Sequence, residues 1–324
     1  MRARVLKTAA IGLAVAALVV GFELSGSPER PPSPPDPATS MTDQQKATSD
    51  LTMSPRLDPL HVDLASVTPQ PAKAHRDRPA VERFRCHTQT DIPRICTFGD
   101  GTKVMVAFGD SHMAQWFGAL RHVAQSGGYQ LWWATKPGCP AADVLVPFDE
   151  CMRWRDALLR KVAELPRVDL AVIASSSWIT MLRPGTTTIV PTADERAQLW
   201  GSGMAKTVRR IKDTARRIVV IRDTPRLWIN APDCLRASDG DTRPCSQGRS
   251  TSLQPGFWQV EKALERRFAR VRAVQFSSSF CAPQVCRPVT GSMLLRYRDD
   301  SHLTNTFSLA MSETVGRRFK SAFR

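Results

Sequence analysis

From residue 103 onward, short apolar runs alternate with longer amphipathic stretches. The apolar runs predict strands at Lys103–Gly109, Tyr129–Ala134, Val168–Ala174, Ile218–Ile221 and Val271–Phe276. Apolar residues at helical spacing predict helices at Met113–Gln125, Arg153–Leu165, Ala193–Arg217, Gly256–Arg270 and Leu303–Phe319. Strands that alternate with helices are typical of a parallel sheet covered on both faces. We therefore predict an α/β fold of three layers, with a flavodoxin-like parallel sheet.

Residues 1–24 have the layout of a secretion signal. Arg2 and Lys7 precede an apolar run from Ala9 to Phe22. This run is short for a spanning helix, which needs about 20 residues, yet a poor cleavage site follows it. The pattern leaves open a cleaved signal peptide and an uncleaved signal anchor that contacts the membrane. In both cases we expect the remaining chain outside the cytoplasm, either anchored or secreted into the cell envelope.

Residues 25–83 are expected to form a disordered linker. Eleven of the 24 prolines lie between Ser25 and Ala80, and this segment has no Phe, Tyr or Trp. Such a composition buries too little apolar surface to offset the entropy of ordering the chain. Phe84 is the first aromatic residue after the signal, so the predicted folded domain covers residues 84–324.

Composition limits the function classes. The chain is 42% hydrophobic, enough for a packed core, and its 23% charged residues and 24 prolines exclude a polytopic membrane protein. The net charge of +15 suits anionic lipid, cell-wall polymer or nucleic acid without choosing among them. The basic helix at 193–217 is either a polyanion-binding face or a solvated helix with cations near its C-terminus. We favour the solvated helix and predict no nucleic-acid partner.

The eight cysteines fall in neighbouring pairs along the chain. Local pairing costs the least loop-closure entropy, and disulfides are expected in an exported protein. The predicted bonds are Cys86–Cys96, Cys139–Cys151, Cys234–Cys245 and Cys281–Cys286. The alternative is a zinc site, but no two of these cysteines have the C-x-x-C spacing.

The first candidate for chemistry follows the first predicted strand. The sequence Phe108-Gly109-Asp110-Ser111-His112 places a serine at the carboxyl edge of the sheet, where open α/β folds bind ligands. Free backbone N–H groups at the start of the next helix can stabilise an oxyanion there. Taken alone, Ser111 is also an ordinary helix N-cap.

A matching base lies near the other end of the chain. In Asp299-Asp300-Ser301-His302 the short D-x-x-H spacing lets a carboxylate orient the imidazole beside it. Taken alone, these residues are also consistent with helix capping. Together with Ser111 they favour a catalytic Ser-His-Asp set.

These two motifs resemble the first and fifth blocks of the SGNH/GDSL hydrolases. The chain is most similar to the extracytoplasmic SGNH domain attached to type-3 membrane O-acyltransferases, which acetylate bacterial surface glycans. Supporting matches are Gly138-Cys139-Pro140, Ser177-Trp178, Arg222-Asp223-Thr224-Pro225, Cys281 with Cys286, and Tyr297. The resemblance covers about residues 100–322.

The resemblance implies a role for each matching residue. Ser111 would be the nucleophile, His302 the general base and then acid, and Asp299 the orienting carboxylate. Asp300 is the less favoured orienting residue, because the family spacing is D-x-x-H. The backbone N–H of Ser111 and that of Gly138 would belong to the oxyanion hole.

The chain departs from the family pattern in two ways. The third block usually supplies an asparagine as an oxyanion donor, but the corresponding strand is followed here by Ser175-Ser176-Ser177. Ser176 or Ser177 would have to substitute for it. The multi-span acyltransferase domain of the fused relatives is also replaced by one hydrophobic segment, which implies that a separate membrane protein brings the acyl donor.

We therefore expect an exported serine acyltransferase or acylesterase that acts on an acylated polysaccharide or cell-wall glycan through an acyl-Ser111 intermediate. Transfer and hydrolysis share this intermediate, so the sequence leaves both open. The alternative is a non-catalytic glycan-binding or scaffold module, with sugars stacked on tryptophans. The tryptophans considered for stacking are Trp116, Trp132, Trp133, Trp154 and Trp178.

Metal and cofactor chemistry are not expected. The triplets Asp110-Ser111-His112 and Asp300-Ser301-His302 could converge on a metal ion, but adjacent residues rarely both ligate well. The sequence also has no glycine fingerprint for a nucleotide, so we predict neither a metal nor an organic cofactor.

Overall fold

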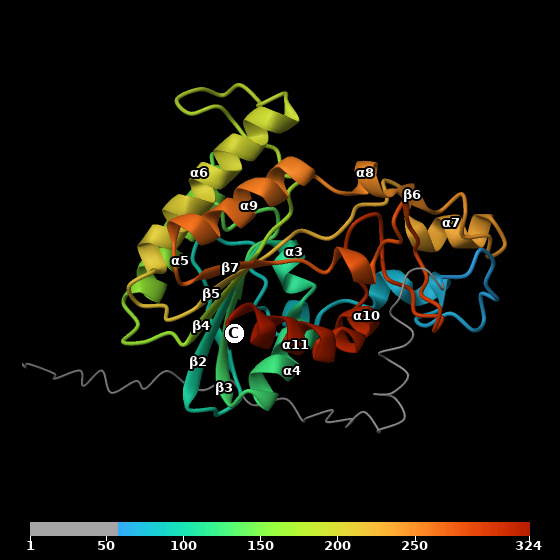
Figure 1. Cartoon of the computed structure of the whole chain (residues 1–324), viewed down its shortest axis with the longest axis horizontal. Helices are drawn as coiled ribbons and strands as arrows, with labels where there is room; N and C mark the ends of the chain where they lie inside the picture. Colours follow the sequence, from blue (N-terminus) through green and yellow to red (C-terminus); the bar gives the residue numbers. More distant parts are fainter. Residues whose placement is uncertain (1–57) are drawn as a thin grey trace, which may run out of the picture. The chain divides into compact units, whose positions relative to one another are not determined.

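The computed structural model describes residues 58–324, and a six-stranded sheet lies at the centre of this part of the chain (Figure 1). Its strands, in chain order, are β1 (Cys96–Phe98), β2 (Lys103–Gly109), β3 (Tyr129–Thr135), β4 (Leu170–Ala174), β5 (Ile218–Ile221) and β7 (Val271–Val274). The spatial order is β1-β3-β2-β4-β5-β7, and all neighbours are parallel except the edge strand β1, which pairs antiparallel with β3. The parallel strands have the flavodoxin-like order. The predicted α/β class is confirmed, and the antiparallel edge makes the sheet mixed.

Side chains on successive strand positions enter two separate hydrophobic clusters. In β2, Met105 and Ala107 face one cluster, whereas Val106 and Phe108 face the other. This alternation in a largely apolar strand is typical of a sheet buried on both faces.

Helices cover both faces of the sheet (Figure 1). One face is covered by α4 (Phe117–Ser126), α10 (Asn305–Ala310) and α11 (Ser312–Ala322). The other is covered by α5 (Asp149–Ala163), α6 (Ala193–Ile211) and α9 (Pro255–Arg267). The predicted helix at 193–217 is shorter than expected, since the chain must turn after Ile211 to enter β5. Its Arg210 pairs with Asp156 at 2.7 Å.

The sequence did not predict the small elements around the sheet. The 3-10 helices are η2 (Pro71–Arg76) and η3 (Ser277–Ser279), and the short α-helices are α2 (Ala80–Arg83), α3 (Ser111–Ala114), α7 (Ala231–Ala237) and α8 (Arg249–Ser252). A separate two-stranded sheet joins β6 (Gln247–Gly248) to β8 (Val285–Cys286). These segments are too short for a hydrophobic period to identify them.

Residues 58–83 pack against the rest of the fold, so the expected linker is wrong for this part of its range. Asp58 forms a fully buried ion pair with Arg296, with oxygen–nitrogen distances of 2.8 and 3.0 Å. Val62 and Val67 enter a small apolar cluster with Leu235 of α7. Short aliphatic residues and one buried charge hold this segment without any aromatic residue, which is why its composition resembled a linker.

All four predicted disulfides are confirmed. They are Cys86–Cys96, Cys139–Cys151, Cys234–Cys245 and Cys281–Cys286.

The predicted signal segment, residues 1–24, and linker residues 25–57 lie outside the described residues. Among residues 58–324, none of the helices combines the length and the hydropathy that crossing a membrane requires.

Candidate active site

Ser111 begins α3 immediately after β2, at the carboxyl edge of the sheet. Asp110 caps this helix, because its Oδ1 accepts a hydrogen bond from the backbone N–H of His112 at 2.8 Å. In the sheet, β3 lies on one side of β2 and β4 lies on the other side. Ser111 therefore sits where the strand order reverses. Open α/β sheets bind ligands at this point.

His302 joins Ser111 to Asp299. Its Nε2 lies 2.9 Å from Ser111 Oγ, and its Nδ1 lies 2.8 Å from Asp299 Oδ2. Ser111 is half-buried and a quarter of the His302 side chain is exposed, so solvent reaches the pair. The structure thus brings together the three side chains that the two motifs predicted, from positions 191 residues apart.

The surroundings of Asp299 favour its ionised form. Burial alone would raise the pKa of this carboxyl, but the hydrogen bond and charge of His302 outweigh burial and lower it. The backbone N–H groups of Ser301 and His302 also donate to Asp299 Oδ1, at 2.9 and 2.7 Å. A fixed carboxylate keeps the imidazole in one tautomer and orientation.

Asp300 points to a different partner. Its Oδ2 accepts hydrogen bonds from the Arg226 guanidinium at 2.6 and 2.9 Å. The neighbouring carboxylates are therefore separated in function: Asp299 contacts His302, and Asp300 holds Arg226.

The expected backbone donors of the oxyanion hole are the N–H groups of Ser111 and Gly138. The first N–H groups of a helix have no intrahelical acceptor, and Ser111 occupies the first position of α3. Gly138 follows β3 with a φ of 63°, in the left-handed region that favours glycine. The backbone N–H of Lys136 donates to Gly109 at 3.1 Å, so this turn adjoins the end of β2.

Ser176 and Ser177, which follow β4, differ in which of their hydrogen-bond donors are free. Ser177 directs both its backbone N–H and its hydroxyl at Asp223 Oδ2, at 2.7 and 2.9 Å. Ser177 is therefore a poor substitute for the missing asparagine. The Ser176 N–H is likewise used by Asp110 Oδ2 at 2.8 Å, so only the Ser176 hydroxyl remains as a side-chain donor.

A buried His-Asp pair next to Ser111 was missed in the sequence. His112 Nδ1 lies 2.5 Å from Asp223 Oδ1, and both side chains are about 95% buried. Burial alone would lower the pKa of His112, but Asp223 raises it to about 9. The His112 ring meets the His302 ring edge to face, with centroids 4.9 Å apart. The available signal was the histidine directly after Ser111, combined with an aspartate two residues after the later parallel strand β5.

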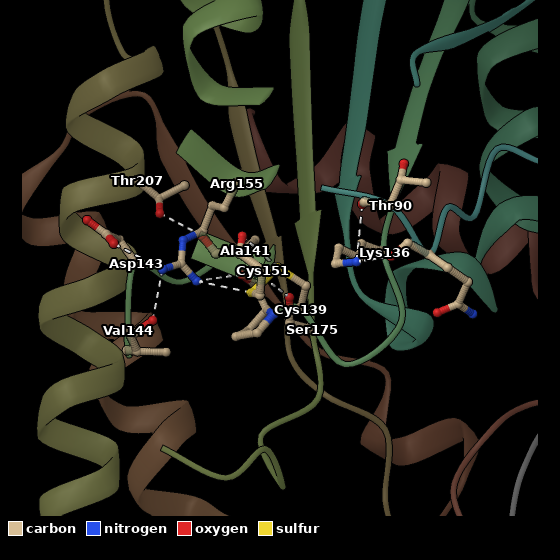
Figure 2. The surroundings of a disulfide bond; sticks show 12 residues. Thr90, Lys136, Cys139, Ala141, Asp143, Val144, Cys151, Arg155, Ser175 and Thr207 are labelled. Carbon is tan, nitrogen blue, oxygen red and sulfur yellow. Dashed lines mark hydrogen bonds and ion pairs between the residues drawn. A yellow bond between two sulfur atoms is a disulfide. The ribbon is translucent and has the colours of Figure 1, made fainter. Parts of the chain in front are cut away.

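The Cys139–Cys151 disulfide ties the Gly138 turn to α5. Figure 2 shows the buried Arg155 beside it, reaching into the loop that follows Cys139. Arg155 donates to the carbonyl of Val144 at 2.8 Å and pairs with Asp143 at 3.1 Å. The backbone N–H of Ala141 also donates to Ser175 Oγ at 2.9 Å, so this loop is fixed to the end of β4 as well.

Within residues 58–324, no group of three or more His, Cys, Asp and Glu side chains is arranged to hold a metal ion. The histidines of the two D-S-H triplets have carboxylate partners instead, Asp223 for His112 and Asp299 for His302.

The fold and this arrangement define the class of SGNH-type acyltransferases and esterases. The chain belongs to the family of SGNH domains fused to AT3 domains, whose model matches residues 85–317. In a comparison with curated proteins, nothing matches the chain.

Solved structures resemble the chain at low identity. The periplasmic domain of the lipopolysaccharide acetyltransferase of Salmonella ser. Paratyphi A is 16% identical, with a TM-score of 0.56 over 80% of this chain and 100% of that one. The aryl esterase of M. smegmatis is 14% identical, with a TM-score of 0.43 over 68% and 100%. A carbohydrate acetylesterase from Sinorhizobium meliloti is 13% identical, with a TM-score of 0.42 over 68% and 99%. The first likeness confirms the fold.

Proposed function

We propose that this protein transfers or hydrolyses O-acyl groups through a covalent acyl-Ser111 intermediate. The observation that carries the proposal is the continuous hydrogen-bonded relay from Ser111 through His302 to Asp299. A serine hydroxyl becomes an effective nucleophile when a neighbouring base takes its proton, and the relay supplies that base.

The hydrogen bonds of the relay assign each step of the proposed reaction to one side chain. Ser111 Oγ attacks the ester carbonyl while His302 Nε2 takes the hydroxyl proton, and Asp299 stabilises the imidazolium. When the tetrahedral intermediate collapses, the ester C–O bond breaks and the proton passes from His302 to the departing alcohol oxygen. Water or a sugar hydroxyl then attacks acyl-Ser111 by the same steps in reverse.

The oxyanion of the intermediate needs donors at the carboxyl edge of the sheet. The backbone N–H groups of Ser111 and Gly138 are the proposed pair, with the Ser176 hydroxyl as the substitute for the family's asparagine. Loss of one such donor typically costs about 10²–10³ in turnover, so we expect a functional but slower centre if Ser176 is a weak substitute.

The proposed substrate is an acylated glycan outside the cytoplasm. The family's fusion to AT3 domains supports this, as do four disulfides, which persist in oxidising compartments. A separate multi-span membrane acyltransferase is the proposed source of the acyl group. The proposed folded domain includes Asp58, which pairs with the buried Arg296, and the proposed signal segment is residues 1–24.

The test uses Ser111→Ala in the full chain. A fluorophosphonate probe should label Ser111 in the native protein and fail to label the variant, and hydrolysis of a simple acetate ester should fall by about 10³-fold or more. Equal ester hydrolysis by both proteins would reject the proposal. Absent labelling of a folded native protein would favour the non-catalytic module, which the missing asparagine supports.

A further inference from the structure

An exposed tryptophan lies on the segment that borders the catalytic loop. Trp228 is 48% exposed, although aromatic side chains of this size are usually covered. Trp178, which follows the β4 serines, packs its ring against Trp228 at a centroid distance of 4.6 Å and an angle of 81°. Of the five tryptophans considered for sugar stacking from the sequence, Trp116, Trp133 and Trp154 are buried in the core and are excluded.

The Trp228 ring is fixed in place at an energetic cost. Its backbone has a φ of 63°, which is strained for a bulky residue. Its indole N–H donates to the Thr251 carbonyl at 3.2 Å, and the Arg226 guanidinium lies 4.2 Å from its ring centroid. A residue held exposed in a strained conformation indicates a binding role more than a packing role.

The same segment is hydrogen-bonded to the catalytic loop. Arg226 binds the carboxylate of Asp300, and the backbone N–H of Leu227 donates to the Asp300 carbonyl at 2.9 Å. The backbone N–H of Ala231 donates to the Asp299 carbonyl at 3.3 Å. The aromatic surface and the acid of the relay are therefore parts of one rigid unit.

We propose that Trp228, with Trp178 at its edge, is a subsite for a sugar ring of the substrate, and that Arg226 and Asp300 bind the hydroxyls of that ring. This inference rests on the proposed function and adds where the glycan binds. A pyranose presents a flat C–H face to an aromatic ring and hydroxyls around its rim. The surface matches both, because charged donors and acceptors flank the indole. An acyl chain would match only the indole.

The experiment compares two acetates that differ in ring structure. Glucose pentaacetate has a rigid pyranose, whereas sorbitol hexaacetate is an open-chain polyol. Trp228→Asn removes the indole and keeps a residue that tolerates the left-handed backbone, and Trp228→Phe keeps an aromatic face. The control is Tyr129→Leu, because Tyr129 also carries a cation, Lys103 at 4.6 Å, but begins β3 at the opposite edge of the sheet.

Trp228→Asn should lower kcat/KM for glucose pentaacetate roughly tenfold and change that for sorbitol hexaacetate less than about twofold, as expected for one lost stacking contact. Trp228→Phe should recover most of the loss, and Tyr129→Leu should change neither substrate. Unchanged activity of Trp228→Asn, or an equal loss on both acetates, would overturn the subsite. Failure of the proposed function is distinct, since Ser111→Ala would then keep both activities.

A protein that hydrolyses neither acetate is tested by binding. Saturation-transfer NMR with cellohexaose should give a signal for the full chain that Trp228→Asn removes and Tyr129→Leu retains. A signal that survives in Trp228→Asn, or no signal in the native chain, would overturn the subsite.

Discussion

His112 and Asp223 form a 2.5 Å hydrogen bond that connects the end of β2 to the end of β5. The other oxygen of Asp223 accepts both donors of Ser177 at the end of β4. Three neighbouring strand ends are thus tied to one buried carboxylate beside Ser111, the proposed nucleophile. In the family pattern an asparagine stands after β4, and here this ion pair organises the same stretch.

Removing His112 should destabilise the protein strongly. His112→Leu leaves Asp223 buried without its cation, which we expect to lower the free energy of unfolding by about 3 kcal/mol. His122→Leu is a matched control, because His122 pairs with Glu313 at 3.0 Å with both side chains 44% exposed. The loss of unfolding free energy in His122→Leu should stay below about 1 kcal/mol. Urea unfolding at pH 7 measures both, and equal effects would contradict the assigned role of the buried pair.

The His112 pair also predicts a pH dependence of stability. Because Asp223 raises the pKa of His112 from 6.5 to about 9, the folded state holds this proton more tightly than the unfolded state. The stabilisation is complete below pH 6.5 and is lost as the pH rises through about 9. The difference in unfolding free energy between the native protein and His112→Leu should therefore shrink from pH 6.5 to 9.5. A constant difference would show that His112 is neutral in the fold.

Asp299 and Asp300 should respond differently to the same substitution. Asp299→Asn replaces the acceptor of the His302 Nδ1 proton and should lower kcat by about 10⁴-fold, as expected for loss of the orienting carboxylate. Asp300→Asn should keep hydrolysis of a simple acetate ester within about tenfold, because its carboxylate binds Arg226 instead of His302. Steady-state kinetics of the two folded variants measures both losses of kcat. A larger loss in Asp300→Asn than in Asp299→Asn would make Asp300 the orienting residue.

Glu261, in α9, gives a second pH prediction. Burial raises its pKa to about 8, and the indole N–H of Trp200 donates to its Oε1 at 3.0 Å. The folded state binds the proton that the unfolded state releases near pH 4.5, so stability falls as the pH rises from 4.5 through 8. Glu261→Gln should flatten this part of the pH profile and stabilise the protein at pH 8. If the pH profile of thermal unfolding is the same in Glu261→Gln as in the native protein, the raised pKa of Glu261 is contradicted.

The sequence predicted the sheet and the relay for one physical reason. Apolar runs such as Leu170–Ala174 are typical of strands buried on both faces, and parallel strands bring their carboxyl ends to one edge. The motif at Ser111 follows this rule, since it comes after β2. The motif at His302 does not follow a strand of this sheet and was predicted from its D-x-x-H spacing. Local clustering likewise predicted the disulfides, because short loops cost the least entropy.

Other features depend on tertiary contacts that leave no periodic signal. The pairing of His112 with Asp223 needs two strand ends that are adjacent only in the folded sheet. Residues 58–83 look like a linker because their interactions are one ion pair, short aliphatic contacts and backbone hydrogen bonds. The exposed Trp228 was missed since its φ and its Arg226 partner are properties of the fold alone.

The Cys139–Cys151 disulfide should affect catalysis as well as stability. Replacing both cysteines by serine frees the turn that carries Gly138, the proposed oxyanion donor. We expect a loss of about 2–4 kcal/mol in unfolding free energy and a fall in kcat of about tenfold or more. The matched control replaces Cys234 and Cys245, whose loop has nearly the same length, with separations of 11 and 12 residues. That variant should lose similar stability and retain kcat, whereas equal losses of kcat would remove Gly138 from the proposed site.

The buried pair of Asp58 and Arg296 connects the N-terminal segment to the catalytic loop. The backbone N–H of Thr304 donates to the Arg296 carbonyl at 3.0 Å, and His302 lies between these two positions in the sequence. Asp58→Ala leaves the Arg296 guanidinium buried without its carboxylate, so we expect a loss of about 3 kcal/mol together with lower kcat. Asp241→Ala is the control, because Asp241 forms only a partly exposed pair with Arg243. Asp58→Ala could instead lose no more stability in urea than Asp241→Ala and keep full activity. That result would contradict a role of the Asp58–Arg296 pair in the catalytic loop and would favour the linker interpretation of residues 58–83.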